Sequence, residues 1–264
     1  MSTRILITND DGIGSPGLHA LAAAAVRAGH EVVVAAPASE ASGSSSSITA
    51  MEEDGRISVE ERGLEGLDGV KAFAVQGAPA FISMIATHGA FGPAPDIVLS
   101  GVNRGANVGR AILHSGTVGA ALTAGVNDGR GLAVSLDTGL NPEDLHWDTA
   151  AQLATDLLPF LLEQDAGCVL NLNVPNSAGP GLPELRTATL TRFGIVQTTL
   201  AERGEQHVRL AIADSTETPD PGSDAALLAA GFATVTAIQP VTGTALPALD
   251  GVSPAAAGAP GGRA

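Results

Sequence analysis

Residues 4–12 read Arg4-Ile5-Leu6-Ile7-Thr8-Asn9-Asp10-Asp11-Gly12, an apolar run that meets two adjacent carboxylates. A short apolar run bounded by Asn, Asp and Gly predicts a buried strand followed by a tight turn. Two carboxylates at the end of a buried strand also make a seat for a hard divalent cation, which prefers oxygen ligands. The tetrapeptide from Asn9 to Gly12 by itself allows both interpretations, a plain turn and a cation site.

Working outward from this stretch, strand and helix patterns alternate as far as residue 175. The expected strands are 4–8, 31–35, 96–99, 132–135 and 168–172, with shorter pieces near Ile57 and Val70. The expected helices are 16–28, 79–87, 117–125 and 148–163. Strands that alternate with helices predict an α/β fold with a mostly parallel sheet.

The pattern changes after Pro175. Residues 187–191, 195–200 and 208–213 are expected to be extended and antiparallel, followed by a helix at 224–230 and a strand at 233–238. We therefore expect one domain over 1–242, with a core at about 1–175 and an extension at about 176–242. Residues 243–264 are rich in Ala, Gly and Pro and are expected to form a weakly ordered tail.

Composition limits the class of protein. The 264 residues are 44% hydrophobic, enough for a sizeable core, and the formal net charge is -15. Such a charge disfavours nucleic-acid polymers and anionic membranes as main partners, because both bind through cationic side chains. A small phosphorylated substrate stays possible, since one metal ion and a helix N-terminus can invert the local field. With no signal peptide or transmembrane-length stretch visible, a cytoplasmic location is expected.

Polar clusters follow several of the expected strands. They are Asp10-Asp11, the serine-rich loop from Ser42-Gly43 to Ser47, the loop containing Asn103 and Asn107, and Ser115-Gly116-Thr117. Each cluster has an ordinary explanation as a turn, a flexible linker or a helix cap. In an open parallel sheet, however, ligands bind beyond the carboxyl ends of the strands, where these loops can converge.

If the loops converge, they form a metal and phosphate site. We expect the metal ligands to be the oxygens of Asp10, Asp11, Ser42 and Asn103, with Asp10, Asp11 and Asn103 carrying catalysis. Free backbone N–H groups at a helix N-terminus hold phosphate, and glycines allow close approach. The expected substrate contacts are Asn9, Gly43, Asn107, His114, Ser115, Gly116 and Thr117. No triad spacing supports a His114–Ser115 nucleophile pair; His114 is interpreted as a pocket wall that could protonate a leaving alkoxide.

Taken together, these stretches resemble the survival protein E (SurE) family of 5'/3'-nucleotidases. The matching segments are 5–12, 15–18, 34–37, 42–43, 47–49, 95–109, 115–121, 171–175 and 231–236. The resemblance implies a Rossmann-like core with helices on both faces and a C-terminal extension that exchanges elements in a homodimer or homotetramer. It also implies one divalent ion, Mg²⁺ or Mn²⁺, held by Asp10, Asp11, Ser42 and Asn103, and hydrolysis of nucleoside monophosphates.

The chain departs from the family pattern around the expected pocket. Ala78 and Phe81 stand where the family usually carries Thr and Asp, and His114 stands where Tyr is common. The residues before Ser42 are Ser39-Glu40-Ala41 in place of basic and polar ones. Phe81 has two interpretations: it fills space, or it offers a ring face to a base or aglycone.

Three other functional hypotheses can be compared with this one, and only the first of them stays in view. One is a degenerate protein of the same fold that binds phosphate or nucleotide without catalysis. The second, a phosphorylated receiver module, needs an Asp after a middle strand and a later Lys, whereas Asp96 precedes its strand and Lys71 lies elsewhere. The third, a haloacid-dehalogenase-type phosphatase, needs two aspartates separated by one residue, unlike Asp10-Asp11.

Overall fold

The computed structural model describes residues 2–139, 144–177, 179, 181–192, 196–203, 208–214, 218–239 and 241–245. The N-terminal elements are β1 (Arg4–Thr8), α1 (Pro16–Arg27), β2 (Glu31–Pro37), β3 (Glu52–Glu53), β4 (Arg56–Ile57), β5 (Val59–Arg62), β6 (Lys71–Val75) and α2 (Pro79–Thr87). Next come β7 (Ile97–Arg104), the 3₁₀ helix η1 (Gly109–His114), α3 (Gly116–Val126), β8 (Arg130–Asp137), α4 (Trp147–Glu163) and β9 (Val169–Pro175). The last are β10 (Leu185–Thr187), β11 (Val196–Arg203), β12 (Val208–Asp214), α5 (Asp224–Ala229) and β13 (Ala233–Ile238).

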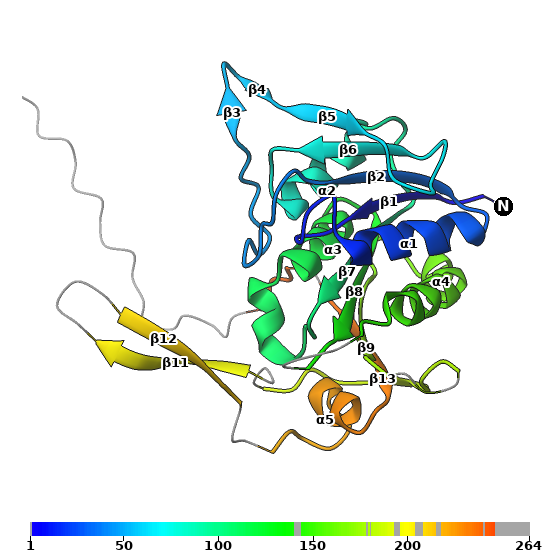
Figure 1. Cartoon of the computed structure of the whole chain (residues 1–264). Helices are drawn as coiled ribbons and strands as arrows, with labels where there is room; N and C mark the ends of the chain where they lie inside the picture. The colour runs from blue at the N-terminus through cyan, green and yellow to red at the C-terminus, as the bar shows by residue number, and fades with distance from the viewer. Residues whose placement is uncertain are drawn as a thin grey trace, which may run out of the picture.

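A nine-stranded sheet forms the centre of the molecule, in the order β10-β13-β9-β8-β7-β1-β2-β6-β5 (Figure 1). The strands from β6 to β9 in this order are parallel, whereas β5 and β13 run antiparallel to their neighbours β6 and β9. Helices α1 and α4 pack on one face, and α2 and α3 on the other. The prediction of a mostly parallel α/β sheet covered on both faces is confirmed.

The sequences of the central strands are continuous hydrophobic runs because an apolar layer covers each face of the sheet. Ile5 and Ile7 of β1 face the α1–α4 layer, and Leu6 between them faces α2. All three side chains are fully buried. A strand buried on both faces needs apolar residues at every position, which is the pattern that predicted β1.

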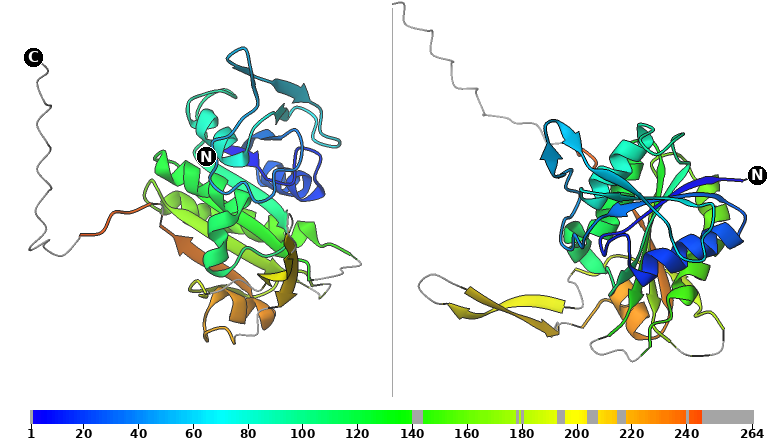
Figure 2. Two further views of the ribbon diagram at one scale, coloured as in Figure 1. Left: turned by 90° about the vertical axis from the view of Figure 1, so that its left-hand side faces the viewer. Right: turned by 45° about the horizontal axis from the view of Figure 1, so that its top comes forward.

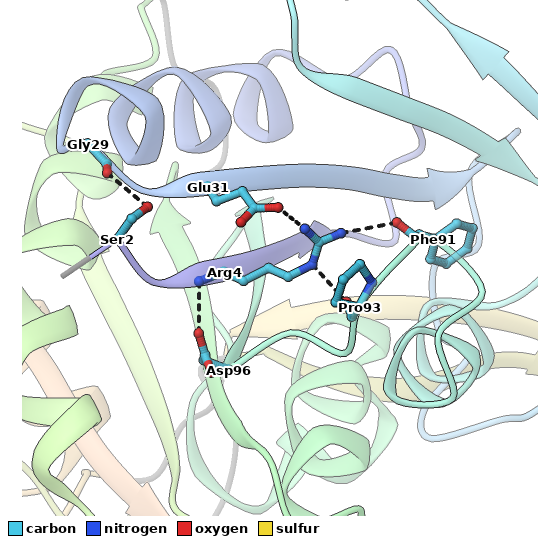
Figure 3. A network of polar contacts seen from close by, with 7 residues as sticks. All are labelled: Ser2, Arg4, Gly29, Glu31, Phe91, Pro93 and Asp96. Atoms are coloured by element: carbon cyan, nitrogen blue, oxygen red, sulfur yellow. Dashed lines mark hydrogen bonds and ion pairs between the residues drawn. The ribbon is translucent and has the colours of Figure 1, made fainter.

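The amino end of β1 is fixed by Arg4 (Figure 3). Its backbone N–H donates to Asp96 Oδ2 at 2.8 Å, and its Nε donates to the carbonyl of Pro93 at 2.7 Å. Its Nη2 donates to the carbonyl of Phe91 at 3.2 Å, and the guanidinium pairs with Glu31 of β2. These contacts tie β1, β2 and the segment before β7 together at the edge opposite the acidic loop.

The structure corrects two sequence predictions. Residues 100–104, expected in a loop, continue β7, because the strand resumes its pairing with β8 after a register shift between Ser100 and Asn103. Residues 187–191 were expected to be antiparallel, but β10 pairs in parallel with β13, and Thr189 bridges in parallel to Ser223. The connection between the two strands, which includes β11, β12 and α5, brings β13 alongside β10 in the same direction.

Strands β11 and β12 form the antiparallel hairpin that the sequence predicted for this region, although residue 195 lies outside the described residues. Within the described part of the chain they pair only with each other. Figures 1 and 2 show the hairpin standing off the main sheet. Of the tail predicted at 243–264, residues 246–264 lie outside the described residues.

Candidate active site

The acidic pair lies at the carboxyl edge of the parallel strands, directly after β1. It opens into a pocket of about 400 Å³. The pocket is lined by Asp10, Asp11, Glu40, Ser42, Gly43, Asn103, Arg104, Asn107, Ala111, His114 and Ser115. These residues come from four separate segments: two follow β1 and β2, one includes the end of β7, and one precedes α3. The convergence that the topology predicted therefore occurs.

Asp10 is almost completely buried, with 5% of its surface exposed. Its Oδ1 accepts a hydrogen bond from the Thr117 hydroxyl at 2.5 Å. Burial raises the pKa of Asp10, and the bonds from Thr117 and from the backbone at Gly116 oppose that rise. A Cβ at Gly116 would lie 2.8 Å from Asp10 Oδ2, so glycine is required for α3 to begin this close to the carboxylate.

Asp11 is half-buried beside Asp10. Burial, together with the negative charge of Asp10, raises the pKa of Asp11 to about 6. The backbone N–H and the guanidinium of Arg104 favour its charged form, while Glu40 disfavours it. Two adjacent carboxylates with raised pKa values repel each other, and a cation between them relieves that repulsion. This is the electrostatic signature expected of a cation site.

Asn103 and Ser42 add neutral oxygens to the pocket. The Asn103 side-chain N–H donates to the carbonyl of Gly105 at 2.8 Å, which leaves its amide oxygen available. The Ser42 hydroxyl donates to Glu40 Oε1 at 2.7 Å, so its lone pairs stay free to coordinate. In the described residues no cluster of three His, Cys, Asp or Glu side chains is arranged as a metal site. The donor set, two carboxylates with amide and hydroxyl oxygens, fits Mg²⁺ or Mn²⁺ better than Zn²⁺.

Asn107 is held in place by hydrogen bonds to β8 and β9. Its N–H donates to Asn173 Oδ1 at 2.8 Å, and its carbonyl accepts from the side chains of Asn171 and Asn173 at 2.8 and 2.9 Å. Its own side-chain N–H donates to Ser135 at 2.9 Å. Sequence reasoning did not assign this role to Asn171 and Asn173. The sequence does hold a clue to this role: Asn171 and Asn173 are two residues apart, so they lie on the same face of an otherwise apolar strand.

The start of α3 forms one wall of the pocket. Ser115 is the N-cap, and its Oγ accepts from the backbone N–H of Val118 at 3.1 Å. The capping interpretation is therefore correct, and the Ser115 hydroxyl hydrogen stays available to a ligand. His114 is exposed and lines the same wall. The first backbone N–H groups of α3, at Gly116 and Thr117, bond to Asp10 and favour its charged form, and the Ser115 hydroxyl is left as a donor to a bound anion.

Three of the expected substrate contacts do not line the pocket: Asn9, Gly116 and Thr117. Asn9 is fully buried, and its side chain is occupied by Gly12 and Ser15. It holds the turn after β1, so the turn interpretation is correct for this residue. Thr117 and Gly116 lie behind Asp10 and position its carboxylate.

The structure also brings to the pocket three residues whose roles the sequence did not predict. Glu40 and Arg104 bring opposite charges to the pocket wall. The Ser44 hydroxyl is buried without a hydrogen-bond partner among the described residues. It lies 2.6 Å from the point where a Gly116 Cβ would stand, close to Asp10. No motif predicted these positions, because the spacing of residues does not fix the direction of side chains in a loop or at the end of a strand.

Fold and site define a class: an α/β protein with an acidic, oxygen-lined pocket at the carboxyl edge of a parallel sheet, beside a helix N-terminus. A family model described as "Survival protein SurE" matches residues 5–199. The chain belongs to the SurE family.

Relatives of known name agree with this assignment. The 5'-nucleotidase SurE of Xanthomonas campestris pv. campestris (strain B100) is 38% identical over 177 residues, 66% of this chain and 64% of that protein. The match thus spans less than two thirds of the Xanthomonas relative. The 5'-nucleotidase SurE of Nitratidesulfovibrio vulgaris is 35% identical over 243 residues, 89% of this chain and 93% of that protein. The crystal structure of the SurE protein from Aquifex aeolicus shares the fold, with a TM-score of 0.67 and 25% identity over 89% of this chain and 93% of that chain.

Proposed function

We propose that this protein is a divalent-metal-dependent phosphomonoesterase that acts on nucleoside 5'- or 3'-monophosphates or a related small phosphate monoester. Its relatives carry the name 5'-nucleotidase. The observation that carries the proposal is the shared pocket of Asp10, Asp11 and Asn103, bordered by the N-terminus of α3. Cation ligands and anion donors on adjacent walls suit a phosphate monoester bound to a metal ion.

In this proposal Asp10, Asp11, Ser42 and Asn103 hold one Mg²⁺ or Mn²⁺ ion. When bound, such an ion supplies charge neutralisation at the phosphoryl group. The Arg104 guanidinium lines the same pocket and can bind phosphoryl oxygens. The Thr117 hydroxyl donates to the Asp10 carboxylate, which fixes the direction of this group and favours its charged form.

The pocket end of α3 positions the substrate. The Ser115 hydroxyl donates to a phosphoryl oxygen, and Gly43 and Asn107 border the same space. His114 faces the pocket from the exposed side, where it can give a proton to the leaving alkoxide. Most of the rate enhancement then comes from positioning and electrostatics.

Assembly and location are further parts of the proposal. We place the exchange between subunits of a homodimer or homotetramer at the β11–β12 hairpin, which stands off the sheet (Figure 2). Mass measurement in solution, before and after deletion of the hairpin, tests this. A cytoplasmic location is proposed from the sequence and is tested by cell fractionation. Separately, none of the helices in the described residues has the length and apolarity needed to cross a membrane.

Phosphate release decides between the enzyme and a binding-only protein. The purified protein is incubated with nucleoside and sugar monophosphates, with Mn²⁺ or Mg²⁺ and then with chelator. Release that depends on the ion and is lost in Asp10→Asn and Asp11→Asn supports the proposal. Binding of nucleotide without release indicates the degenerate alternative, and turnover retained in either variant refutes the assignment of the acidic pair.

A further inference from the structure

A buried carboxylate lies in the C-terminal extension, outside the lining of the acidic pocket. Asp224 is the first residue of α5, and none of its surface is exposed. Helix α5 packs beside β9 and β13, at the end of the sheet away from β5 (Figure 1). Burial of a carboxylate is costly unless the group is hydrogen-bonded. The hydrogen-bond partners of Asp224 therefore indicate its role in the fold.

Three backbone N–H groups donate to the Asp224 carboxylate. The N–H of Gly109 donates to Oδ2 at 2.7 Å. The N–H of Thr191 donates to Oδ1 at 2.9 Å, and that of Ala225 donates to the same oxygen at 2.8 Å. Ala225 is the next residue in α5, whereas Gly109 and Thr191 belong to distant parts of the chain. The carboxylate thus joins three segments.

Gly109 connects this carboxylate to the active pocket. It is the first residue of η1, and Ala111 and His114 of the same short helix line the pocket wall. The φ of Gly109 is 62°, in the left-handed region that favours glycine, so the chain turns sharply where η1 begins. Each turn of a 3₁₀ helix is hydrogen-bonded to the next, so the position of its first residue influences that of its last. Asp224 therefore fixes the start of the helix that ends at His114.

Two further contacts join η1 to the extension. Val108, directly before η1, is buried and packs against Leu228 of α5. The N–H of Arg110 donates to the carbonyl of Thr191 at 3.2 Å. Thr191 thus binds η1 through its carbonyl, while its own N–H donates to Asp224. The start of η1 is therefore supported by one apolar contact and by hydrogen bonds that depend on the Asp224 carboxylate.

The acidic pair is supported by different contacts. Asp10 follows β1 and accepts a hydrogen bond from Thr117 of α3, and Asn107 is bonded to β8 and β9. Neither support involves η1 or α5. Removal of the Asp224 carboxylate should therefore displace η1 and leave the expected cation site at Asp10 and Asp11 in place. This separation makes the role of Asp224 measurable.

We propose that Asp224 is a positioning residue, which acts through η1 to hold His114 where it gives a proton to the leaving group of the substrate. This inference rests on the proposed function and adds a residue of the C-terminal extension to the same site. Asp224 itself touches no substrate, because it is fully buried and lies outside the pocket lining. Its loss should slow those reactions in which the leaving alkoxide needs a proton.

The first test compares two phosphate monoesters that differ in their leaving group. Adenosine 5'-monophosphate releases an alkoxide that needs a proton, whereas p-nitrophenyl phosphate releases a phenolate that leaves without one. In the full chain with Mn²⁺, Asp224→Ala should lower kcat for the first ester by at least about tenfold and for the second by less than about threefold. The matched control is Asp220→Ala, which removes an exposed carboxylate just before α5 and should change neither value. Equal losses for both esters in Asp224→Ala overturn the proposal.

A double-mutant cycle with His114→Ala tests whether Asp224 acts through His114. In the His114→Ala chain, Asp224→Ala should lower kcat for adenosine 5'-monophosphate no further than about twofold. An equal fold loss with and without His114 indicates a purely structural role and overturns the proposal. Leu228→Ala keeps the carboxylate and removes the α5 contact with Val108, so it gives the same comparison if Asp224→Ala does not fold. It should also slow the nucleotide more than p-nitrophenyl phosphate, and equal slowing overturns the proposal.

Amide hydrogen exchange, followed by NMR, measures the contact without catalysis. The Gly109 amide should exchange at least about tenfold faster in Asp224→Ala than in Asp220→Ala, because its acceptor is gone. Titration should give the same Kd for Mn²⁺ in both variants. An unchanged exchange rate at Gly109, or weaker Mn²⁺ binding by Asp224→Ala, overturns the proposal. If the unsubstituted protein hydrolyses neither ester, the proposed function fails, while the exchange rate at Gly109 still decides whether Asp224 holds η1.

Discussion

Replacing Thr117 by Val tests whether α3 prepares Asp10 for a cation. The Thr117 side chain is completely buried, and its hydroxyl donates to Asp10 Oδ1 at 2.5 Å. Valine has nearly the same shape, so the change removes one hydrogen bond and little packing. A hydrogen bond to a charged group contributes roughly 1.5–3 kcal/mol. Loss of this bond frees the carboxylate to rotate and raises further a pKa that burial already raises.

Both consequences weaken cation binding at neutral pH. The carboxylate must be reordered, and more of it carries a proton that the cation must displace. Residues that orient metal ligands typically change metal affinity by about 10–100-fold when they are substituted. We therefore expect Thr117→Val to raise the Kd for Mn²⁺ by about that factor at pH 7, and we expect part of the deficit to disappear at pH 8.

The assay is calorimetric titration of Mn²⁺ into the metal-free protein, with Thr123→Val as the matched control. Thr123 lies on the same helix, and its hydroxyl donates to the carbonyl of Gly119 at 2.8 Å, away from the acidic pair. The control should bind Mn²⁺ as the unsubstituted protein does. If the two variants bind Mn²⁺ equally well, Thr117 does not prepare Asp10, and the reasoning is refuted.

Four further outcomes follow from the structure. Gly116→Ala places a Cβ 2.8 Å from Asp10 Oδ2 and should weaken Mn²⁺ binding by at least about tenfold. Gly14→Ala is the control, because nothing lies within 4 Å of its new atom, and it should leave Mn²⁺ binding unchanged. If Gly14→Ala weakened Mn²⁺ binding more than Gly116→Ala, the close approach of Gly116 to Asp10 would be contradicted. Burial and the Asp10 charge raise the pKa of Asp11 to about 6, so titration should show Mn²⁺ affinity about tenfold weaker at pH 5 than at pH 7. In the metal-free protein, Asp11 keeps its proton up to about pH 6 when folded, whereas the unfolded chain releases it near pH 4. The free energy of unfolding should therefore fall as the pH rises through 6. A free energy of unfolding that does not change over this pH range would be evidence against the raised pKa of Asp11. Arg4→Met removes the contacts that the Arg4 side chain makes in Figure 3 with Glu31, Pro93 and Phe91, and it keeps the backbone bond to Asp96. It should lower the free energy of unfolding in urea by roughly 1–3 kcal/mol, with Mn²⁺ affinity unchanged. A change in affinity would show that the two ends of β1 are coupled.

The central fold could be predicted because its strands are buried on both faces. Burial on both faces requires apolar side chains at Ile5, Leu6 and Ile7. The end of this apolar run therefore predicted where the strand ends and the acidic loop begins. The pairing of β10 could not be predicted, because three residues carry no alternation strong enough to set a direction. The course of the chain from β10 to β13, through β11, β12 and α5, makes the two strands parallel.

The main pocket residues could be predicted in part, because the topology of a parallel sheet brings loops from the same edge together. Asp10, Asp11 and Asn103 follow β1 or lie at the end of β7 for this reason. The roles of Glu40 and Arg104 in the pocket were not predicted, since spacing does not fix the direction of exposed side chains in a loop or at the end of a strand. Asn9 was predicted as a substrate contact from its place beside Asp10, but its buried carboxamide is used by the turn itself.

The most direct test of the account is a crystal structure of the protein grown with Mn²⁺ and measured at the manganese absorption edge. The account predicts one anomalous peak in contact with the carboxylates of Asp10 and Asp11 and the amide oxygen of Asn103. A map without a peak there, or with these side chains directed away from one another, would contradict the claim that this pocket holds a divalent ion.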